Sequence, residues 1–411
     1  MKAKTIAIIG AGGRGQLFAD TIHRHAALGR VVAVAEPIAD RRQWLVQRCG
    51  IEPANAFDGW QQFVAQPKLC DAVVISTLDR EHAGPAVACL KKGYDLLLEK
   101  PIGVTLAECR RIEAAQRASG RIVAVCHSLR YQKWFRRVKD LIAGGAIGRL
   151  MTLDLIEQVG YWHQAHSFVR GNWGNASRAS FMLLAKSCHD LDYLAWLVEK
   201  PCRRVSSFGH RSYFRRELMP AGATARCTDG CPHEPTCAYS AIRAYVDANR
   251  KVWPANAISL DHRRKAHLRA IQTGPYGRCV WRCDNDVVDH QVVALEFAGE
   301  VTATFTMTGF TKDGGRRLRA HGTHGELQFD EKQIVLKTFG RAADRRLKVS
   351  AEAGGHGGGD ERVVRAWLKA LHSGDAAGVV ANAQESLRTH TIVFAAERSR
   401  LEGRTITLAE M

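Results

Sequence analysis

The sequence predicts an α/β fold whose N-terminal part is an open, doubly wound parallel sheet with helices on both faces. Short apolar runs alternate with amphipathic stretches through the first third of the chain, which is the pattern of repeated strand–helix–strand units. A glycine-rich turn lies between the first apolar run and the first amphipathic stretch. This is the place that such a turn has in a dinucleotide-binding unit.

The expected strands of this sheet are short and apolar along their whole length, as strands covered on both faces are. They lie at 5–9, 31–35, 72–75, 95–98 and 121–125. Helices are expected at 16–25, 82–92 and 105–119. This alternation implies crossover connections between parallel strands.

The composition is ordinary for a globular protein. The chain has 411 residues, of which 46% are hydrophobic and 24% charged, so we expect two or three domains with a large buried core. No apolar run reaches the roughly 18 residues of a membrane span, and the N-terminus lacks a secretory signal, so we expect a cytoplasmic protein. The net charge of +18 is spread along the chain without a nucleic-acid-binding motif. We therefore expect neither a membrane nor a nucleic acid as partner.

The glycine-rich turn has the spacing of a dinucleotide-binding fingerprint. Gly10 permits the tight turn, Gly12 lets the backbone approach a pyrophosphate, and Gly15 allows close helix packing. The N–H groups and dipole of the following helix stabilise the phosphate charge. Glu36, at the end of the second strand, would accept hydrogen bonds from a ribose and repel a 2′-phosphate. The pattern favours NAD over NADP, a preference that the arginine pair at 41–42 weakens.

A lysine is expected at the edge of the sheet where ligands bind. The tripeptide Glu99-Lys100-Pro101 follows the strand at 95–98, so Lys100 faces the crevice at the carboxyl ends of the strands. Glu99 can hold the ammonium group in place, and Pro101 fixes the backbone just beyond it. The same tripeptide elsewhere would be a surface turn, but after a nucleotide-binding fold it indicates a functional residue.

A histidine further along the chain suits proton transfer. The stretch 186–197 reads as a helix, with Lys186, His189 and Asp190 on one face because they are three and four residues apart. Neutral His189 can accept the hydroxyl proton of an alcohol that loses a hydride. Lys100 can stabilise the negative charge on the same oxygen. The competing interpretation is a structural histidine that Asp192 satisfies.

Four motifs together resemble the Gfo/Idh/MocA oxidoreductases, which include glucose–fructose oxidoreductase and inositol dehydrogenase. They are the glycine turn, Ser76-Thr77…His82, Glu99-Lys100-Pro101 and His189-x-x-Asp192. The resemblance implies an NAD-binding Rossmann domain at 1–128 and, at 129–411, a substrate-binding and oligomerisation α/β domain on a large, mostly antiparallel sheet. It also implies nicotinamide-dependent chemistry on a sugar or polyol. The implied cofactor contacts are Gly10, Gly12, Gly13, Arg14, Gly15, Glu36, Thr77, His82, Glu99 and Lys100.

One position departs from the family pattern. Many members carry an aspartate four residues before the histidine, but Ala185 stands there and Lys186 lies beside it. Either Asp190 or Asp192 then orients His189, or Lys186 takes a new role. The expected catalytic set is Lys100, His189, Lys186 and Asp192.

The expected substrate site draws on two segments. His127, Arg130 and Tyr131 border the cleft, unless Arg130 and Tyr131 only anchor the crossing between the domains. The segment 161–173 is dense in aromatic and basic groups, and we expect a substrate loop rather than a core segment. Its contacting residues are Trp162, His163, His166, Arg170 and Trp173. Arg170 would suit a carboxylate, sulfonate or phosphate. The glycine-rich loop 354–360 either closes over the site or is a hinge.

An insertion at about 202–285 lies outside the general family pattern and is rich in cysteine. Cys227, Cys231 and Cys237 are close enough to share one tetrahedral ion, with a fourth ligand from Cys279, Cys283 or His233. The spacing is not a standard CxxC pair, so a structural zinc on Cys227, Cys231, Cys237 and Cys279 competes with free thiols. A reducing cytoplasm argues against disulfides.

The remaining stretches predict further sheet strands and two helices. Strands are expected at 287–297, 301–310, 321–329 and 333–336, with a hairpin at Glu300, and helices at 362–372 and 382–401. Open sheets of this family commonly pair face to face, so the resemblance implies a homodimer or homotetramer.

Three functions remain open at this point. The leading one is an NAD-dependent dehydrogenase that moves a hydride between nicotinamide and a ring carbon of a sugar or polyol, anionic if Arg170 binds it. The second is an NAD-dependent glycosidase that oxidises a ring hydroxyl, eliminates the aglycone, adds water and reduces the ketone again, with an anionic glycoside such as a sulfosugar as substrate. The third is a non-catalytic NAD-sensing regulator. Such a regulator is expected to lack the lysine and the histidine, and both are present.

Overall fold

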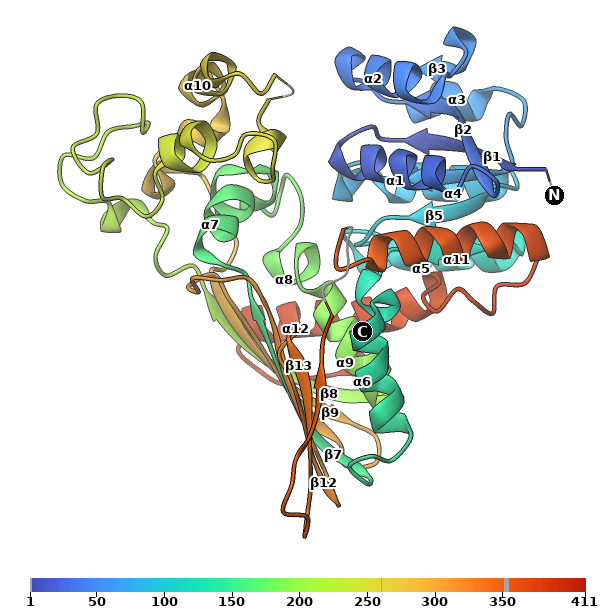
Figure 1. Ribbon diagram of the computed structural model, residues 1–411, viewed down its shortest axis with the longest axis vertical. Coiled ribbons are helices and arrows are strands. Elements are labelled where there is room, and N and C mark those ends of the chain that lie inside the picture. Colours follow the sequence, from blue (N-terminus) through green and yellow to red (C-terminus); the bar gives the residue numbers. More distant parts are fainter. Residues whose placement is uncertain (1, 260, 351–354) are drawn as a thin grey trace.

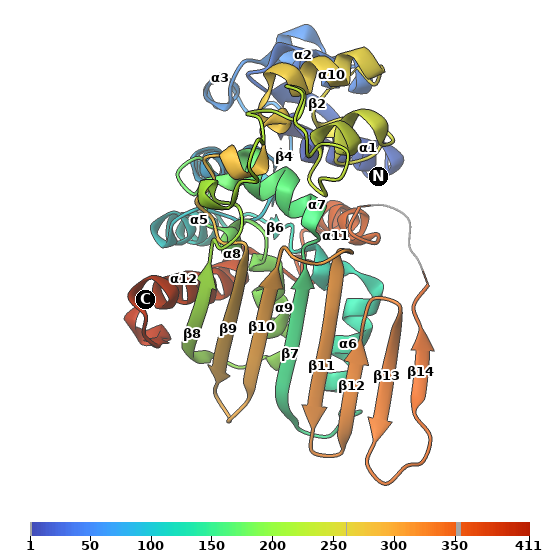
Figure 2. The same cartoon turned by 90° about the vertical axis from the view of Figure 1, so that its left-hand side faces the viewer.

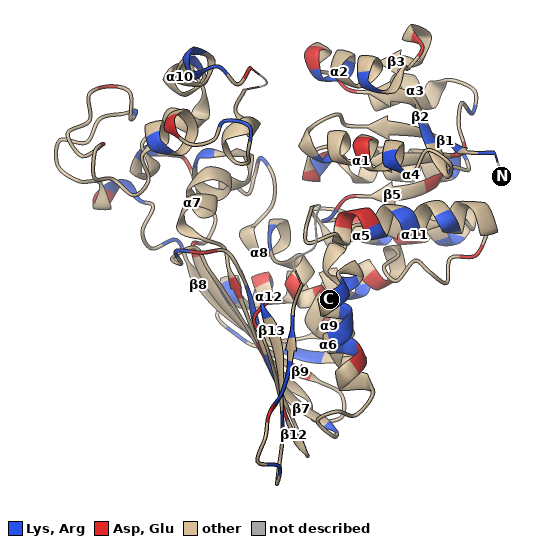
Figure 3. Cartoon of the chain, viewed as in Figure 1, with Lys and Arg blue, Asp and Glu red and all other residues tan. Residues whose placement is uncertain are grey.

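Two β-sheets organise the protein (Figure 1). The structure is a computed structural model that describes residues 2–259, 261–350 and 355–411. A six-stranded sheet takes the N-terminal third, and a nine-stranded sheet takes much of the remainder. Figure 3 shows basic and acidic residues spread over both parts, as the sequence indicated. No helix in the three described ranges is long and apolar enough to cross a membrane.

The N-terminal sheet is parallel, with the strand order β3-β2-β1-β4-β5-β6. The order reverses between β1 and β4, and such sheets bind dinucleotides at the carboxyl ends of the strands that flank the reversal. The strands are β1 (Lys4–Ile9), β2 (Gly29–Ala35), β3 (Ala56–Phe57), β4 (Ala72–Ile75), β5 (Asp95–Leu98) and β6 (Val123–Val125). The helices are α1 (Gly13–Arg24), α2 (Ala39–Cys49), α3 (Trp60–Ala65), α4 (Ala83–Lys91) and α5 (Leu106–Ser119).

The strands and helices predicted for this sheet are all present, with small differences at their ends. The sequence did not predict β3, α2 or α3. Strand β3 has two residues, too few for a periodic signal. Helix α2 buries only Leu45, so its apolar spacing is weak.

The second sheet is mostly antiparallel, as the family resemblance implied, and β7 and β10 form its parallel pair. Its strands are β7 (Leu150–Gln158), β8 (Cys202–His210), β9 (His290–Phe297), β10 (Thr302–Thr308), β11 (Gly315–Gly322), β12 (Gly325–Phe329), β13 (Gln333–Thr338), β14 (Arg345–Lys348) and β15 (Ile406–Thr407). The predicted hairpin at Glu300 is confirmed, and that residue has a left-handed φ of 65°. The expected single strand at 321–329 is wrong, because a turn divides it between β11 and β12.

One face of this sheet is covered and the other is open (Figure 2). The helices behind it are α6 (Lys133–Ala143), α9 (Cys188–Val198) and α12 (Ala383–Glu402), and they share a core with the inward side chains of the strands. Outward side chains include Phe208, which is 70% exposed, and Val292, which is 42% exposed. Pairing of copies through the open face stays a prediction.

The chain returns to the N-terminal sheet near its end. Helix α11 (Gly359–Ser373) buries Val363, Trp367 and Leu368 in the core of the parallel sheet. Helix α11 therefore packs with the first sheet although it lies far beyond residue 128 in the chain, and the predicted domain boundary stays a prediction. This return places the residues just before α11 beside the glycine turn.

The cysteine-rich insertion lies between β8 and β9. Because β8 (Cys202–His210) belongs to the sheet, the segment outside the sheet begins after His210 rather than at residue 202. Its longest helix is α10 (Arg264–Thr273). The insertion packs on two small clusters, one around Tyr245 and one around Trp281 that also includes Ala165 and Val169. Figure 1 shows α10 level with the N-terminal sheet but apart from it.

A buried ion pair joins the two sheets. Arg130 donates from Nε and Nη2 to the carboxylate of Asp192 at 2.8 Å, and both residues are at most 1% exposed. A third donation from Nη1 reaches the carbonyl oxygen of Val380. A charge buried this deeply is stable only while its partner is present.

We predict that Asp192→Asn lowers the free energy of unfolding by about 3–5 kcal/mol, because the buried Arg130 guanidinium then keeps only the partly exposed carboxylate of Glu385, 3.6 Å away, as a counter-charge. Urea denaturation measures this. The matched control is Asp20→Asn, which breaks the exposed pair with Arg48 and should cost about 1 kcal/mol or less. Equal losses for the two variants would contradict the structural role of the buried pair.

Candidate functional site

The glycine turn fits a dinucleotide. Gly10 has a φ of 93°, and a Cβ there would lie 2.6 Å from the Ser76 carbonyl oxygen. A Cβ at Gly15 would lie 2.0 Å from the Gly10 oxygen, so both positions admit only glycine. In front of Gly13 there is open space within 4 Å, and at Gly12 only Arg41 comes as near as 4.0 Å. A phosphate can therefore approach the N-terminus of α1 at these two glycines.

Glu36 is buried at the end of β2, beside this turn. Its carboxylate accepts hydrogen bonds from the backbone N–H groups of Ala11 at 2.6 Å and Ile38 at 2.9 Å. A carboxylate has about four acceptor positions, so capacity remains for ribose hydroxyls. Arg42 donates to the Glu36 carbonyl oxygen and pairs with Asp58, whereas Arg41 lies near Gly12.

Arg14 connects three parts of the site. Its Nε donates to Glu99 at 2.5 Å, and Nη1 and Nη2 donate to Asp360 at 2.8 and 2.9 Å. Asp360 also accepts from Ser128 Oγ and from His356. Burial alone would raise the pKa of Asp360, but the charge of Arg14 and these hydrogen bonds hold it well below its usual range. Arg14 and Glu99 pair with each other here, and their expected contact with the cofactor stays a prediction.

Thr77 and His82 line the end of β4. His82 is buried, and its ring nitrogens lie 2.6 Å from the Pro101 carbonyl oxygen and 3.2 Å from that of Thr77. His82 therefore ties β4 to the segment that follows Lys100. The Thr77 hydroxyl donates to the Glu81 carbonyl oxygen.

Lys100 and His189 come together at the carboxyl edge of β5. Lys100 Nζ donates to the backbone oxygen of Ala185 at 2.6 Å, four residues before His189 in the chain. His189 is 5% exposed, and within the described residues its Nδ1 has no hydrogen-bond partner. Burial, then the charge of Lys100, lowers the pKa of His189 well below its ordinary value. The imidazole is therefore neutral at physiological pH and can accept a proton.

The helix expected over 186–197 begins only at Cys188 and so does not include Lys186. Helix α8 (Met182–Ala185) ends before Lys186 and α9 begins at Cys188, so Lys186 and His189 do not share a helix face. Lys186 pairs with Glu157 at 2.6 Å, and Asp190 pairs with Arg316 at 2.5 Å.

Neither predicted aspartate orients His189, because each has an arginine partner. Asp192 instead lies 3.7 Å from His127 Nδ1. The alternative of a new role for Lys186 remains, and the structure gives that lysine a buried carboxylate partner.

Three residues near His189 or His127 were not predicted. His356 and His390 form a row with His189 and His127, in which successive ring centres from His356 are 5.9, 5.8 and 5.6 Å apart. Arg316 lies close enough to affect the pKa of His189. The prediction for the loop at 354–360 rested on its glycines, but the residue of this loop that lies near His189 is His356. Gly354 is outside the described residues.

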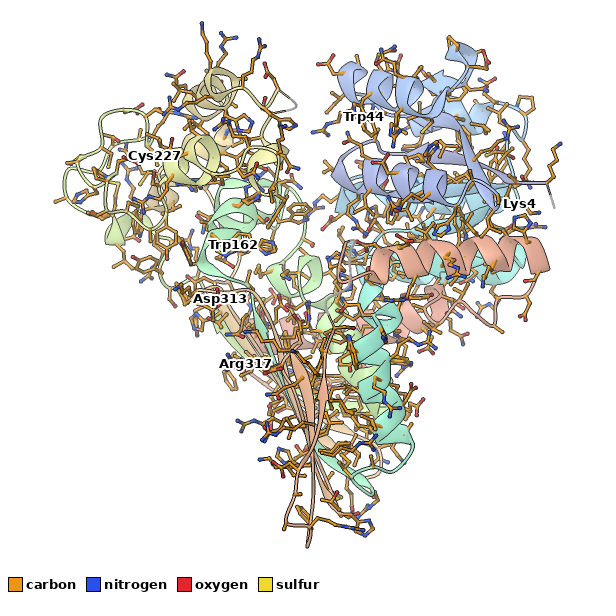
Figure 4. All side chains as sticks on the ribbon, in the orientation of Figure 1. Lys4, Trp44, Trp162, Cys227, Asp313 and Arg317 are labelled. Atoms are coloured by element: carbon orange, nitrogen blue, oxygen red, sulfur yellow. The ribbon has the colours of Figure 1, made fainter. Side chains whose placement is uncertain are left out.

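Aromatic side chains of the predicted substrate loop stand beside the lysines. Trp162 belongs to α7 (Tyr161–His163), stacks on His163 and, with it, contacts Trp253 of the insertion (Figure 4). Burial first, then the charges of Lys186 and Lys100 among others, lowers the pKa of His163. His163 therefore faces the lysines while Trp162 and Trp253 extend the aromatic surface outward.

Other residues of that loop have structural partners. His166 lies in the π-helical stretch Gln164–Arg170, 3.0 Å from the Tyr245 hydroxyl, and it stacks on Tyr276. Trp173 donates its indole N–H to Asp79. Arg170 is 2% exposed, and its Nε and Nη2 groups donate to the carbonyl oxygens of Arg278 and Tyr239 at 2.7 Å, so its role in binding a substrate anion stays a prediction.

Arg130 and Tyr131 are anchors rather than cleft residues. Arg130 holds Asp192, and the Tyr131 hydroxyl accepts a hydrogen bond from the backbone N–H of Val380. Both are at most 2% exposed. His127 lies between His189 and His390 with no hydrogen-bond partner for either nitrogen among the described residues.

The predicted metal ligands lie around one cavity of about 20 Å³, whose lining includes Cys227, Cys231, Cys237 and Cys279. All of the cysteines are free thiols. Across the described ranges, however, no three His, Cys, Asp or Glu side chains have the arrangement of a formed metal site. The expected zinc site is therefore not supported as a preformed one.

Two family models match the sequence. One, described as an oxidoreductase family with an NAD-binding Rossmann fold, matches residues 4–127, and the other, described as the GFO/IDH/MocA C-terminal domain, matches residues 135–328. The chain belongs to the Gfo/Idh/MocA oxidoreductase family. The resemblance seen in its motifs is thereby confirmed, and so is the NAD-binding character of its first domain.

Relatives with curated names are distant. The oxidoreductase YteT of Bacillus subtilis is 25% identical over 323 residues, which cover 74% of this chain and 73% of that protein. Inositol 2-dehydrogenase of Rubrobacter xylanophilus is 26% identical over 201 residues, which cover 49% of this chain and 54% of that protein. The chain thus spans about half the length of this inositol dehydrogenase.

Solved structures share the whole fold. Levoglucosan dehydrogenase in complex with NADH and L-sorbose has a TM-score of 0.73 at 16% identity and covers 99% of both chains. An Agrobacterium radiobacter oxidoreductase in complex with NAD⁺, L-tartaric acid and magnesium has a TM-score of 0.70 at 15% identity, over 100% of both chains. At these identities the likeness establishes the fold alone.

We predict that acid destabilises the protein through its buried neutral histidines. Burial lowers the pKa of His127 to about 4, whereas an unfolded histidine titrates near 6.5. Between these values the unfolded chain binds a proton that the folded chain does not, so stability falls as the pH falls. Urea denaturation from pH 7 to pH 4.5 measures the slope.

The variant His127→Gln should reduce that slope by up to about 1.4 kcal/mol per pH unit, which is the contribution of one proton. The control is His23→Gln on the exposed face of α1, which should leave the slope unchanged. A slope that is the same in His127→Gln and in the unsubstituted protein would show that His127 is not held neutral by burial.

Proposed function

We propose that this chain is an NAD-dependent dehydrogenase that moves a hydride between nicotinamide and a carbon of a sugar or polyol. The observation that carries the proposal is the convergence of Lys100 and His189 at the carboxyl edge of β5, one strand from the reversal in strand order. An ammonium donor beside a neutral imidazole is what an alcohol needs to lose a proton and a hydride together.

The chain's own groups have distinct tasks in this reaction. Bound NAD supplies the hydride acceptor. His189, buried and neutral, accepts the hydroxyl proton. Lys100 donates a hydrogen bond to the same oxygen and stabilises its developing negative charge, and the backbone oxygen of Ala185 fixes the direction of the ammonium group.

The substrate we propose is a neutral ring. Trp162, His163 and Trp253 form an aromatic surface beside the lysines, and the C–H faces of sugar rings pack well on such surfaces. The expectation of an anionic substrate depended on Arg170, whose donors are already used by backbone oxygens. The named sugar and polyol dehydrogenases among the relatives and solved structures support the same substrate class.

A second candidate, the redox-neutral glycosidase, is favoured by one observation. His163 is a neutral base close to two ammonium groups, those of Lys186 and Lys100. Elimination of an aglycone requires a base for the C–H next to the new ketone and an acid for the leaving oxygen. The site thus holds more proton-transfer groups than a simple dehydrogenation uses.

We predict that NADH accumulates when the protein is incubated with NAD and a panel of free sugars and polyols. The same panel should include aryl glycosides, with aglycone release followed by absorbance. Aglycone release without NADH accumulation would replace the dehydrogenase by the glycosidase. No turnover in either assay, with NAD binding intact by calorimetry, would instead favour the non-catalytic regulator.

Variants connect any activity to this site. His189→Asn should lower kcat by about 10²- to 10⁴-fold, the usual contribution of a general base, and Lys100→Met should lower it at least as much because its charge is also lost. NAD affinity should change little in His189→Asn. The control is Lys91→Met, an exposed lysine at the end of α4, which should retain full activity. Unchanged turnover in His189→Asn would contradict the assignment.

A further inference from the structure

Four cysteines that the proposed function does not use surround one small cavity in the insertion. Cys227, Cys231 and Cys237 come from the turns at 219–240, and Cys279 comes from the far end of the insertion. The cavity has a volume of about 20 Å³, which is the room of a single ion or one water molecule. We call it the cysteine cavity, and Cys227 marks its place in Figure 4, far from the N-terminal sheet.

A buried cation stands at the wall of the cysteine cavity. Arg170 lines it at 2% exposure, and its Nη2 lies 3.7 Å from Cys227 Sγ. Among the described residues no carboxylate pairs with Arg170, which donates to the carbonyl oxygens of Arg278 and Tyr239 and also contacts the Tyr245 side chain. An arginine buried in this way requires a nearby negative charge. Thiolates at the cavity would supply that charge.

A backbone N–H group points toward one of the sulfur atoms. The N–H of Ala241 donates to Cys227 Sγ at 3.4 Å. A hydrogen bond of this kind favours the thiolate, which is the form that binds metal.

We propose that the cysteine cavity is a structural site for one thiophilic divalent cation of the zinc type, held by Cys227, Cys231, Cys237 and Cys279 with Arg170 as the buried counter-charge. A divalent ion with four thiolates carries a net charge of two minus, which the guanidinium partly neutralises. The size of the cavity suits a single ion rather than a multi-iron cluster.

Binding requires the sulfur atoms to move inward, because no three of them stand at ligand geometry within the described part of the chain. The polypeptide that carries three of them can make this movement. Residues 219–240 consist of turns and bends, apart from an isolated bridge between Arg226 and Arg278. Contraction of this segment does not have to break a helix or a sheet.

The site would stabilise a part of the protein that has little core. The insertion packs on two small apolar clusters, one of which contains Cys279 and Trp281. Arg170 lines the cavity and belongs to the π-helical stretch Gln164–Arg170. This stretch directly follows α7, the helix that carries Trp162 and His163. Metal at the cavity therefore fixes the wall of the proposed substrate site, although the inference does not depend on the reaction catalysed.

The test uses the full chain purified in reducing buffer and elemental analysis of bound zinc. We expect about one zinc per chain, lost in Cys231→Ser and in Cys279→Ser. The matched control is Cys283→Ser: this thiol belongs to the same sequence cluster but does not line the cavity and lies against the Cys279 carbonyl oxygen. Zinc should remain in that variant.

A second measurement needs no variant and so does not depend on their folding. Co²⁺ added to the metal-free, reduced protein should produce thiolate-to-cobalt charge-transfer absorption at one equivalent, and metal should protect the insertion between β8 and β9 from proteolysis. The proposal is overturned if Co²⁺ gives no such band, if zinc remains in both Cys231→Ser and Cys279→Ser, or if iron and sulfide are present in its place.

Discussion

The arrangement of the site depends on the guanidinium of Arg14. It stands in the first turn of α1, directly after Gly13, and holds Glu99 on one side and Asp360 on the other. The contact of Arg14 with Glu99 fixes the end of β5, next to Lys100. Its contact with Asp360 fixes the start of α11. The glycine turn, the lysine and the loop that carries His356 are therefore set relative to one another by one cation between two carboxylates.

Burial controls the charge state of the groups around Lys100. The imidazoles of His189, His163 and His127 all have a pKa lowered first by burial, so they are neutral beside the ammonium groups. The cations Lys186 and Arg316 are balanced by Glu157 and Asp190 within the same buried cluster. A site with neutral bases and a directed ammonium donor favours proton removal from a neutral alcohol over binding of a carboxylate.

The sequence predicted the elements whose physical signal is local. Apolar runs identified the buried strands, and the glycine spacing identified the turn, because each depends on neighbouring residues alone. The resemblance then implied Lys100 and His189, which the fold brings together. Partners far apart in the sequence were not predictable in this way: Arg14 meets Asp360, Asp190 meets Arg316, and His189 meets His356. The partners of Arg170 were not predictable either, because only the folded insertion shows that backbone oxygens accept from two of its donor groups.

A crystal structure of the chain with NADH tests the central claim most directly, because it locates the pyrophosphate and the nicotinamide in one experiment. The account predicts the pyrophosphate at Gly12 and Gly13, against the N-terminus of α1, and the C4 atom of the nicotinamide on the side of Lys100 Nζ and the His189 imidazole. A dinucleotide bound elsewhere, or a nicotinamide ring whose C4 atom faces away from both residues, would contradict it.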